Sequence, residues 1–538
     1  MRSPDTERST PSTSAVATLG EQPSLVPLSA TLAFSTNSYA RLASLISKPT
    51  FQYVLLALIT LLAGALRFYK LGEWSFWGDE MFTVSGREDG FNYNFFRESI
   101  SLVLIQAVVN ARGISEWNAR LVPALTGVVS IPVLYFPIKK MFKPAVGLIV
   151  VLLLALSPWH LYWSQSARFY VPLLLFYTLA LLTFYLGVEE DRPWYLILSL
   201  VFLGLATKER LLALFFIPVV ASYVVLLQAL PFNRPRGLRA RNLAIFIIPG
   251  LILGLFFVRP YILNLSGWLE GFGYSNNNPF WIIAGVVYYT GLPTVSMAVV
   301  GAVYGLARKN RAVLLLTLSA AVPVLAVAII APFHYTANRY AFGALTSWLI
   351  LAGLAVVELF RHMPRNISVL VLGAVLLLLV QPMSENVLYY RYQNGNRDNW
   401  KAAFELVKEK KEEGDLVVAI NPELSNYYLQ ERVTVGLRYF DLTSLESSNE
   451  RVWFIEDMVT EQKFPHVHHW LTNHTQLIGI FDTVVQARNF TMRVYLYDPG
   501  THITETNQSS SIRAKRSMLQ PGKVSNEAHS TSKINSIG

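Results

Sequence analysis

Long apolar runs recur through most of the sequence and limit what the chain can fold into. A helix needs roughly 20 mostly apolar residues to cross the hydrocarbon core of a bilayer. We count eleven such runs, at about 51–69, 118–138, 145–164, 169–188, 193–207, 211–230, 243–263, 280–306, 312–332, 340–360 and 366–382. With 53% hydrophobic and only 15% charged residues among 538, the composition is also too apolar for a soluble protein. We therefore predict a polytopic α-helical membrane protein.

The basic residues gather in the connections between these runs. A net charge of +10 could indicate nucleic-acid binding, but most of the clustered cations fall in four connections. They are Lys139, Lys140 and Lys143; Arg234, Arg236, Arg239 and Arg241; Arg308, Lys309 and Arg311; and Arg361 and Arg365. With eleven spans and a cytoplasmic N-terminus, all four connections lie in the cytoplasm, as the positive-inside rule requires. The charge is thus interpreted as a topology signal, and no nucleic-acid partner is predicted.

The rest of the sequence divides into two tails and one further folded region. Residues 1–48 are rich in Ser, Thr and Pro, which predicts a disordered cytoplasmic tail rather than a cleaved signal peptide. Residues 49–384 form the predicted membrane domain, whose first external loop covers 70–117. Residues 385–500 are predicted to form an extracytoplasmic domain, and the polar residues 501–538 a second disordered tail.

The predicted extracytoplasmic domain combines helical and strand patterns. Trp400, Phe404 and Val407 repeat at helical spacing, and the pattern stops at Gly414. Four apolar or alternating segments then indicate strands, which are "LVVAI", "RVWFIED", "FDTVVQAR" and "MRVYLYDP". Helices between strands predict a small α/β domain.

Cysteine and histidine content limits the kinds of site available. The chain has no cysteine, which excludes disulfides, thiolate metal sites and a cysteine nucleophile. His466, His468 and His469 lie close together without an adjacent acidic partner, so we interpret them as a solvated helix start rather than a metal site. The sequon at Asn473 matches the glycosylation pattern but decides nothing without a known compartment.

Ionisable residues near the spans concentrate at the predicted outer ends. Asp79 and Glu80 follow the first span, Arg168 begins the fourth, Lys208 lies at the turn between the fifth and sixth, and Arg339 precedes the tenth. A transporter binds its substrate near the bilayer midplane, whereas this pattern indicates chemistry at the outer leaflet. Two simpler interpretations stay open, because the Asp could cap an interfacial helix and the cations could be anchors that extend to the interface.

Several segments, taken in order, resemble those of a known enzyme superfamily. They are "FWGDE", "GISEWNARLVPALTGVVSIPVLY", "LSPWHLYWSQSARFYVPLLLFYTLAL", "TKER", "ANRY" and "RDNWKAAFEL". Between about residues 50 and 500, this order and spacing resembles the polyprenyl-phosphate-dependent GT-C membrane glycosyltransferases, which include protein O-mannosyltransferases and the aminoarabinose transferase of lipid A. The resemblance implies a GT-C fold of about eleven transmembrane helices with a C-terminal extracytoplasmic domain.

The resemblance also implies a reaction. A sugar moves from a polyprenyl-phosphate donor to an acceptor hydroxyl on a protein, lipid or glycan, at the outer face of the membrane and with inversion. In this sequence Asp79 would be the base, and Glu80 would orient the acceptor or balance charge. The implied phosphate-binding residues are Arg168, Lys208 and Arg339, and the implied lining residues are Trp77, His160, Gln165, Tyr170 and Tyr340.

Two differences from the superfamily pattern leave the acceptor and any metal open. Many relatives carry an acidic residue where this chain has Ser166, and many carry a His-Pro element that the first loop here lacks. A divalent cation therefore stays an open cofactor, with the lipid-linked donor and membrane lipids as the implied partners. The alternative functions are a ligase or polymerase that uses lipid-linked sugars and, from another class, a transporter of lipid-linked sugars.

Overall fold

The computed structural model describes residues 48–84, 99–262, 278–362, 368–431, 434–437, 440–445, 450–485 and 488–499. The chain forms two units, residues 1–52 and 53–538, and all the contacts discussed below lie within the second. Apart from Lys48, the two predicted tails fall outside the described residues.

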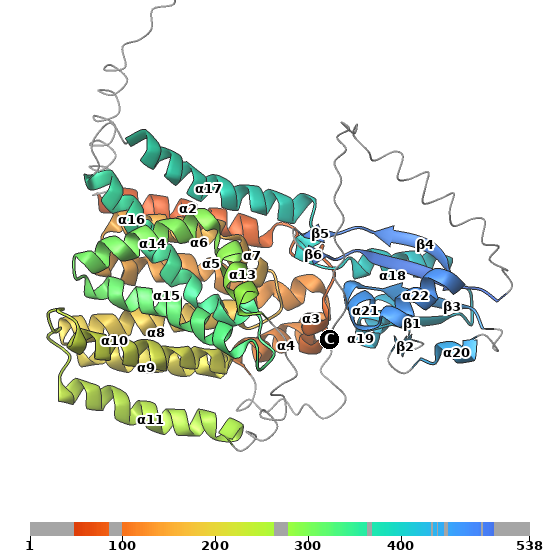
Figure 1. Cartoon of the computed structure of the whole chain (residues 1–538), viewed down its shortest axis with the longest axis horizontal. Helices are drawn as coiled ribbons and strands as arrows, with labels where there is room; N and C mark the ends of the chain where they lie inside the picture. Colours follow the sequence, from red (N-terminus) through yellow and green to blue (C-terminus); the bar gives the residue numbers. More distant parts are fainter. Residues whose placement is uncertain are drawn as a thin grey trace, which may run out of the picture. The chain divides into compact units, whose positions relative to one another are not determined.

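All eleven predicted apolar runs are helical where they are described (Figure 1). Their helices are α2 (Pro49–Phe68), α5 (Glu116–Met141), α6 (Pro144–Leu156) with α7 (Pro158–Ser164), α8 (Tyr170–Glu190), α9 (Pro193–Glu209), η1 (Leu211–Phe215) with α10 (Phe216–Ala229), α11 (Ala240–Ile262), α13 (Pro279–Thr290) with α14 (Leu292–Ala307), α15 (Arg311–Ile330), η2 (Asn338–Ala344) with α16 (Leu345–His362), and α17 (Ser368–Arg391). The chain is thus a multi-pass membrane protein, as predicted.

The structure does not confirm the predicted number of eleven spans. Among the described residues, seven helices are long and apolar enough to cross a membrane, or up to nine if two bent helix pairs each count as one span. The pair α6 and α7 bends by 60° and the pair α13 and α14 by 96°. The predicted run at 280–306 is therefore a broken helix: Gly291, at a φ of 93°, ends one helix, and Pro293 lies in the first turn of the next. Helix α9 has only 17 residues.

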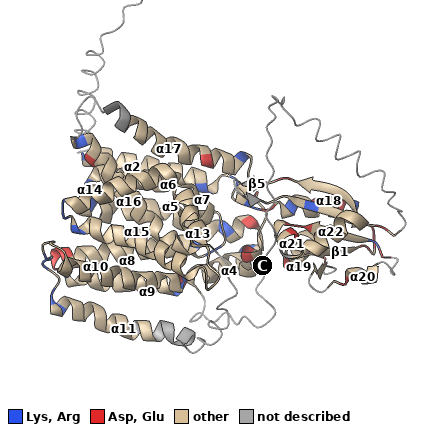
Figure 2. Cartoon of the chain, viewed as in Figure 1, with Lys and Arg blue, Asp and Glu red and all other residues tan. Residues whose placement is uncertain are grey.

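Figure 2 shows charged residues mainly at helix ends and in the connecting loops. Three of the basic connections meet at the C-terminal end of α8, where three consecutive acids pair with them. The pairs are Arg311 with Glu189, Lys140 with Glu190 at 3.0 Å, and Arg239 with Asp191 at 3.1 Å. These connections therefore share one end of the helix bundle, in agreement with the sidedness that the positive-inside rule requires.

The first loop contains two helices, α3 (Gly78–Val84) and α4 (Ile100–Arg112). Ser99 caps α4 by accepting a hydrogen bond from the backbone N–H of Leu102. The buried carboxylate of Glu209, at the end of α9, accepts hydrogen bonds from the backbone N–H and hydroxyl of Ser101. Residues 85–98, between the two helices, lie outside the described residues.

The C-terminal region is an α/β structure, as predicted. Its elements are α18 (Trp400–Lys410), β1 (Leu416–Ala419), α19 (Pro422–Leu429), β2 (Thr434–Gly436), α20 (Leu442–Leu445), β3 (Val452–Glu456), α21 (Met458–Lys463), α22 (Pro465–His474), β4 (Gln476–Phe481), β5 (Val484–Val485), β6 (Arg488–Asn489) and β7 (Met492–Tyr497). The main sheet has the order β2-β1-β3-β7-β4, parallel from β2 to β3 and antiparallel thereafter.

The predicted strand "FDTVVQAR" is wrong as a single strand, because Phe481 ends β4 while β5 pairs with β6 in a separate two-stranded ribbon. The helical start predicted for the histidine cluster is confirmed at Pro465. The absence of an acidic partner is not, because His468 Nδ1 lies 2.7 Å from Oε1 of the buried Glu456.

One apolar core joins the sheet region to the first loop. Trp400 and Phe404 on α18 and Trp453 on β3 belong to the same buried cluster as Phe76 of the first loop and Ile105 on α4. Burying side chains of this size removes large apolar areas from water. The first loop is therefore held between the membrane helices and the α/β region, and this arrangement positions the residues next to Asp79.

Candidate active site

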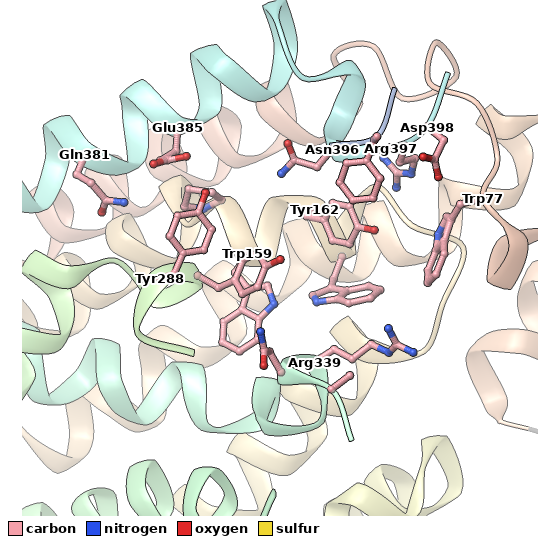
Figure 3. A pocket seen from close by; sticks show the side chains of 16 residues that line it. Trp77, Trp159, Tyr162, Tyr288, Arg339, Gln381, Glu385, Asn396, Arg397 and Asp398 are labelled. Carbon is pink, nitrogen blue, oxygen red and sulfur yellow. The ribbon is translucent and has the colours of Figure 1, made fainter. Parts of the chain in front are cut away.

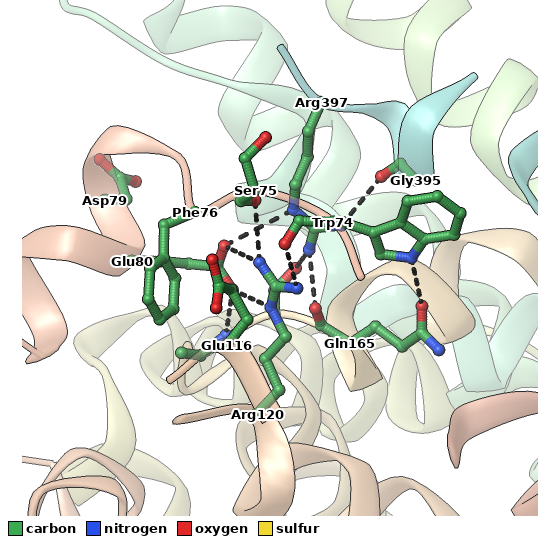
Figure 4. Close-up of polar contacts among 12 residues, drawn as sticks. Trp74, Ser75, Phe76, Asp79, Glu80, Glu116, Arg120, Gln165, Gly395 and Arg397 are labelled. Atoms are coloured by element: carbon green, nitrogen blue, oxygen red, sulfur yellow. Dashed lines mark hydrogen bonds and ion pairs between the residues drawn. The ribbon is translucent and has the colours of Figure 1, made fainter. Parts of the chain in front are cut away.

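A buried ion pair fixes the first loop to the start of α5. The Glu80 and Arg120 side chains are both fully buried, and their bidentate contact has distances of 2.9 Å from Nε to Oε1 and 2.8 Å from Nη2 to Oε2 (Figure 4). The remaining donors of Arg120 bond to the carbonyls of Leu71, Trp74 and Ser75 at 3.0–3.1 Å. All five guanidinium donors are thus used, which is the condition under which a buried charge is tolerated.

A second arginine joins this pair from the segment after the last span. Arg397 Nη2 donates to the Gln165 carbonyl and to Ser166 Oγ, each at 2.7 Å, and its Nε lies 3.6 Å from Glu80 Oε2. The backbone N–H of Ala167 donates to Glu80 Oε1 at 2.8 Å. We call Glu80, Arg120 and Arg397 the Glu80 clamp. Burial alone would raise the pKa of Glu80, but the two guanidinium groups and the Ala167 N–H hold it below its ordinary value.

A sharp turn brings Arg397 into the clamp. Asn394, Gly395 and Asn396 all have a positive φ, of 45°, 61° and 56°. A Cβ atom on the central glycine would lie 2.6 Å from Cγ of the Trp74 ring, so only glycine fits at this point. The turn therefore depends on asparagines, which tolerate the left-handed conformation, and on one glycine at a close contact.

The clamp changes the interpretation of Glu80. Both of its oxygens are occupied by protein donors, so the carboxylate cannot orient an acceptor without breaking the pair. Its contacts match the other predicted role, which was to balance charge. Ser166, which stands where many relatives carry an acid, accepts a hydrogen bond from Arg397.

The clamp also bears on the open question of a metal. Asp79 and Glu80 cannot act together as ligands while Glu80 is paired with Arg120. In the part of the chain that the structure describes, no group of three His, Cys, Asp or Glu could hold a metal ion. The described residues thus do not fit a divalent cation, and no step is assigned to one.

Asp79 lies at the edge of the clamp with its side chain about one-third exposed, at 32%. Arg168 Nη2 is 3.8 Å from Asp79 Oδ2, while Nη1 donates to the Asp79 carbonyl at 2.9 Å and to Thr83 Oγ1 at 3.1 Å. Because α3 begins at Gly78, Asp79 belongs to its first turn and does not cap it. The arginine fixes the helix and leaves the Asp79 carboxylate partly open to solvent.

Several cations surround this carboxylate. The guanidinium groups of Arg168 and Arg210 each lie 5.2 Å from the centre of the Phe169 ring. Arg339 lies 5.7 Å from the ring centre of Tyr340 and interacts electrostatically with Asp79.

Tyr170 completes the group, since it lies close enough to Arg168, Arg339, Tyr340 and Asp79 for these groups to influence its hydroxyl. The structure thus brings together five of the sequence-predicted site residues, which are Asp79, Arg168, Tyr170, Arg339 and Tyr340. Lys208 lies in the last turn of α9, beside Glu209. Its neighbour Arg210, also in "TKER", lies close enough to Arg168 and Tyr340 for its charge to influence both.

A cavity of about 190 Å³ opens next to these cations (Figure 3). Its wall mixes aromatic rings with polar side chains, and two predicted site residues, Trp77 and Arg339, belong to it. The other lining residues are Pro158, Trp159, Tyr162, Trp163, Tyr288, Tyr289, Ala337, Asn338, Gln381, Glu385, Asn396, Arg397, Asp398 and Phe490. Burial and the nearby carboxylate of Asp457 raise the pKa of Asp398 to about 7.

Of the five predicted lining residues, only Trp77 belongs to this wall, since Tyr170 and Tyr340 are also absent from it. The other two, His160 and Gln165, are fully buried in the packing. His160 Nδ1 lies 2.8 Å from Nη2 of Arg67, and because a guanidinium only donates, this nitrogen must accept. Arg67 is itself fully buried and donates to the carbonyls of Leu154 and Ala155 at the negative end of α6.

Gln165 accepts from Trp74 Nε1 at 3.2 Å and from the Tyr389 hydroxyl at 2.8 Å. Its amide donates to the Arg67 and Tyr69 carbonyls at 3.0 and 2.8 Å. Gln165 therefore connects α2, the first loop and α17.

The sequence analysis did not predict several residues of the site, among them Arg67, Arg120, Arg397 and Asp398. A signal existed for the second and third, because "EWNARL" and "RDNW" each carry an arginine within segments that resemble the superfamily. An arginine in the first turn of an apolar run indicates a site as strongly as an acid there, since a buried arginine requires partners.

Comparisons with known proteins agree with this architecture. Residues 101–260 match the family described as dolichyl-phosphate-mannose-protein mannosyltransferase. Among solved structures, the chain is similar to ArnT from Cupriavidus metallidurans bound to undecaprenyl phosphate, with 14% identity and a TM-score of 0.54 over 83% of this chain and 98% of that one. The chain has the GT-C fold. This confirms the resemblance to polyprenyl-phosphate-dependent glycosyltransferases that the sequence predicts.

A second GT-C structure is similar over a comparable stretch. AglB from Archaeoglobus fulgidus, an archaeal oligosaccharyltransferase in complex with an inhibitory peptide and a dolichol-phosphate, is 12% identical, with a TM-score of 0.51 over 76% of this chain and 70% of that one. No curated protein matches the sequence. The family match and the GT-C fold together support a glycosyltransferase that depends on a lipid phosphate.

Proposed function

We propose that this protein transfers a sugar from a polyprenyl-phosphate donor to an acceptor hydroxyl at the outer face of the membrane, with inversion at the anomeric carbon. The observation that carries the proposal is the position of Asp79, which is partly exposed, lies beside Arg168 and interacts electrostatically with Arg339, a residue of the cavity wall. ArnT and AglB, whose structures contain undecaprenyl phosphate and dolichol-phosphate, support a lipid phosphate as the carrier.

The proposed step is a single displacement. The acceptor oxygen attacks the anomeric carbon, the bond from that carbon to the phosphate oxygen breaks, and the lipid phosphate leaves with the electron pair. Asp79 takes the proton from the acceptor hydroxyl. Arg168 and Arg339 stabilise the charge that develops on the phosphate, and Arg210 adds a third cation nearby. Lys208 stays a candidate from the sequence, while Glu80 holds the loop that carries Asp79.

The alternative classes differ in where they need polar groups. A transporter of lipid-linked sugars requires binding groups near the midplane, whereas the proposed site lies at the helix ends next to the first loop. A ligase or polymerase would use the same outer-face chemistry with a glycan as the acceptor. It would be recognised by an acceptor that is itself a saccharide.

Neutralising Arg168 or Arg339 is expected to lower transfer about ten- to a hundredfold in kcat/KM, because each charge-assisted contact to the phosphate contributes about 1.5–3 kcal/mol. The measurement is sugar transfer from polyprenyl-phosphate donors in membranes that contain Arg168→Ala or Arg339→Ala. Arg391→Ala, an exposed arginine at the end of α17, is the matched control and should be unchanged. Normal rates in both test variants would make these arginines anchors and contradict the phosphate assignment.

Residues 390–500 are expected to lie outside the cytoplasm, on the side that holds the proposed site. A reporter that is active only outside the cytoplasm, fused after residue 499, should therefore be active. The same reporter inserted in the basic connection between α14 and α15 should be silent. Activity from the second fusion and silence from the first would reverse the topology and place the proposed site inside the cell.

A further inference from the structure

The cavity beside Arg339 contains hydrogen-bonding atoms that the protein does not satisfy. Among the described residues, Trp77 Nε1, Trp163 Nε1 and Arg339 Nε are buried donors without a partner, and Asn396 Oδ1 is a buried acceptor without one. All four residues line the cavity. Buried polar atoms are almost always bonded in native proteins, so this concentration indicates a ligand that both donates and accepts hydrogen bonds.

Asp398 adds a carboxylate to the same wall, on the side of Trp77 and Arg397 (Figure 3). Its backbone is held from both sides, because Ser75 Oγ donates to its carbonyl at 2.7 Å and Asn399 caps α18. Its carboxylate forms no ion pair with a described residue and lies near the like charge of Asp457. A hydrogen-bond donor on a ligand would stabilise the Asp398 carboxylate in this buried position.

The lining indicates the chemistry of that ligand. Trp77, Trp159 and Tyr162 supply flat faces, while Asn396 and Asp398 supply acceptors between them. A polyprenyl tail requires a continuous apolar wall, which the polar side chains interrupt. A phosphate could bind Arg339 at one side of the cavity, but the Asp398 carboxylate on the same wall would repel it. A sugar ring instead presents apolar C–H faces to aromatic rings and hydroxyl groups that donate and accept hydrogen bonds.

The position of Arg339 connects the cavity to the proposed reaction. The same residue lines the cavity and interacts electrostatically with Asp79. If Arg339 holds the donor phosphate, the sugar linked to that phosphate would therefore lie in or next to the cavity.

We propose that this cavity binds the sugar ring of the donor, with Trp77 and Trp163 as hydrogen-bond donors to its hydroxyl groups and Asn396 and Asp398 as acceptors. The inference rests on the proposed function, and it adds the residues that would distinguish one donor sugar from another. It also gives the segment after the last span a direct role in substrate recognition, since Asn396 and Asp398 both belong to it.

The test compares two ligands that differ only in the sugar. Binding of undecaprenyl phosphate and of a panel of undecaprenyl-phosphate sugars (mannose, glucose, galactose and arabinose) is measured on the full-length protein in nanodiscs. The wild type should bind at least one glycosylated lipid more tightly than the bare lipid. At pH 8, above the raised pKa of Asp398, Asp398→Ala should weaken binding of that lipid about tenfold or more, since a hydrogen bond to a charged group is lost. Binding of the bare lipid should stay within about twofold.

Three further variants separate the possible results. Trp77→Phe keeps an aromatic ring but removes a donor, so it should also weaken only the glycosylated lipid, and it serves if Asp398→Ala does not fold. Arg339→Ala should weaken both lipids. Glu413→Gln, an exposed acid in the turn before β1, should weaken neither.

The outcomes that oppose the inference are distinct from those that oppose the proposed function. If the wild type binds bare and glycosylated lipids equally, or if Asp398→Ala and Trp77→Phe weaken both lipids equally, the cavity does not hold the sugar. The lipid-phosphate donor then survives. If the wild type binds neither lipid, the proposed donor class is wrong, and the sugar site fails with it.

Discussion

Asp79→Asn is expected to lower the rate of sugar transfer at least about a hundredfold, because the amide keeps the size of the side chain but cannot take a proton from the acceptor. Donor binding and expression should persist, since Arg168 holds α3 mainly through the Asp79 carbonyl and Thr83, which the substitution leaves in place. The measurement is transfer from a polyprenyl-phosphate sugar in membranes, with binding of the same lipid followed in parallel.

The control for this prediction is Asp79→Glu, which keeps a carboxylate and should retain more activity than the amide. A near-wild-type rate for Asp79→Asn would exclude the residue as the base. Loss of donor binding in step with the rate would instead assign Asp79 to binding.

Breaking the Glu80 clamp is the second large effect that we expect, and it concerns stability. Arg120→Met leaves the fully buried Glu80 carboxylate without its bidentate partner, and removing one member of a buried ion pair costs about 3–5 kcal/mol. Thermal unfolding of the purified protein in detergent should show a markedly lower midpoint. Arg112→Met, at an exposed site at the end of α4, is the matched control and should behave like the wild type.

The double variant Glu80→Gln/Arg120→Met separates charge from packing. Replacing both partners removes the unpaired buried carboxylate, so the double variant should be more stable than Arg120→Met alone. If the double variant is instead as unstable as the sum of the single changes, the clamp acts through packing and the carbonyl contacts of Arg120. In that case Glu80 is not what the arginine stabilises.

Much of the architecture could be predicted from local pattern. Apolar runs near 20 residues in length became helices, and the pattern at Trp400, Phe404 and Val407 became α18, because hydrophobic periodicity is a local property. The group of Asp79, Arg168 and Arg339 was also predictable, because the ends of packed spans on one side of a membrane lie close together. These predictions needed only sequence position and the dimensions of a membrane.

The clamp and the cavity could not be predicted in this way. Glu80 is 40 residues from Arg120 in the sequence, and Arg397 is more than 230 residues from Gln165, whose carbonyl it contacts. Each arginine alone has the sequence context of an interfacial anchor, and only the fold shows that it is buried. The break at Gly291 was missed for a related reason, because composition measures how apolar a segment is and not whether it stays straight.

The left-handed turn at Asn394, Gly395 and Asn396 has a consequence for protein engineering and for evolution. The obvious place to exchange the C-terminal region between homologues is the end of α17, at Arg391, where the membrane helices stop. A chimera joined there would bring in a foreign turn and a foreign counterpart of Arg397, which must pair with Glu80 and donate to the Gln165 carbonyl and the Ser166 hydroxyl of the host. A junction after Asn399 would keep the native turn and the native contacts of Arg397. The C-terminal α/β region can therefore be exchanged as a unit only from a point several residues after the end of α17. Recombination between relatives should succeed more often at this later point than at Arg391.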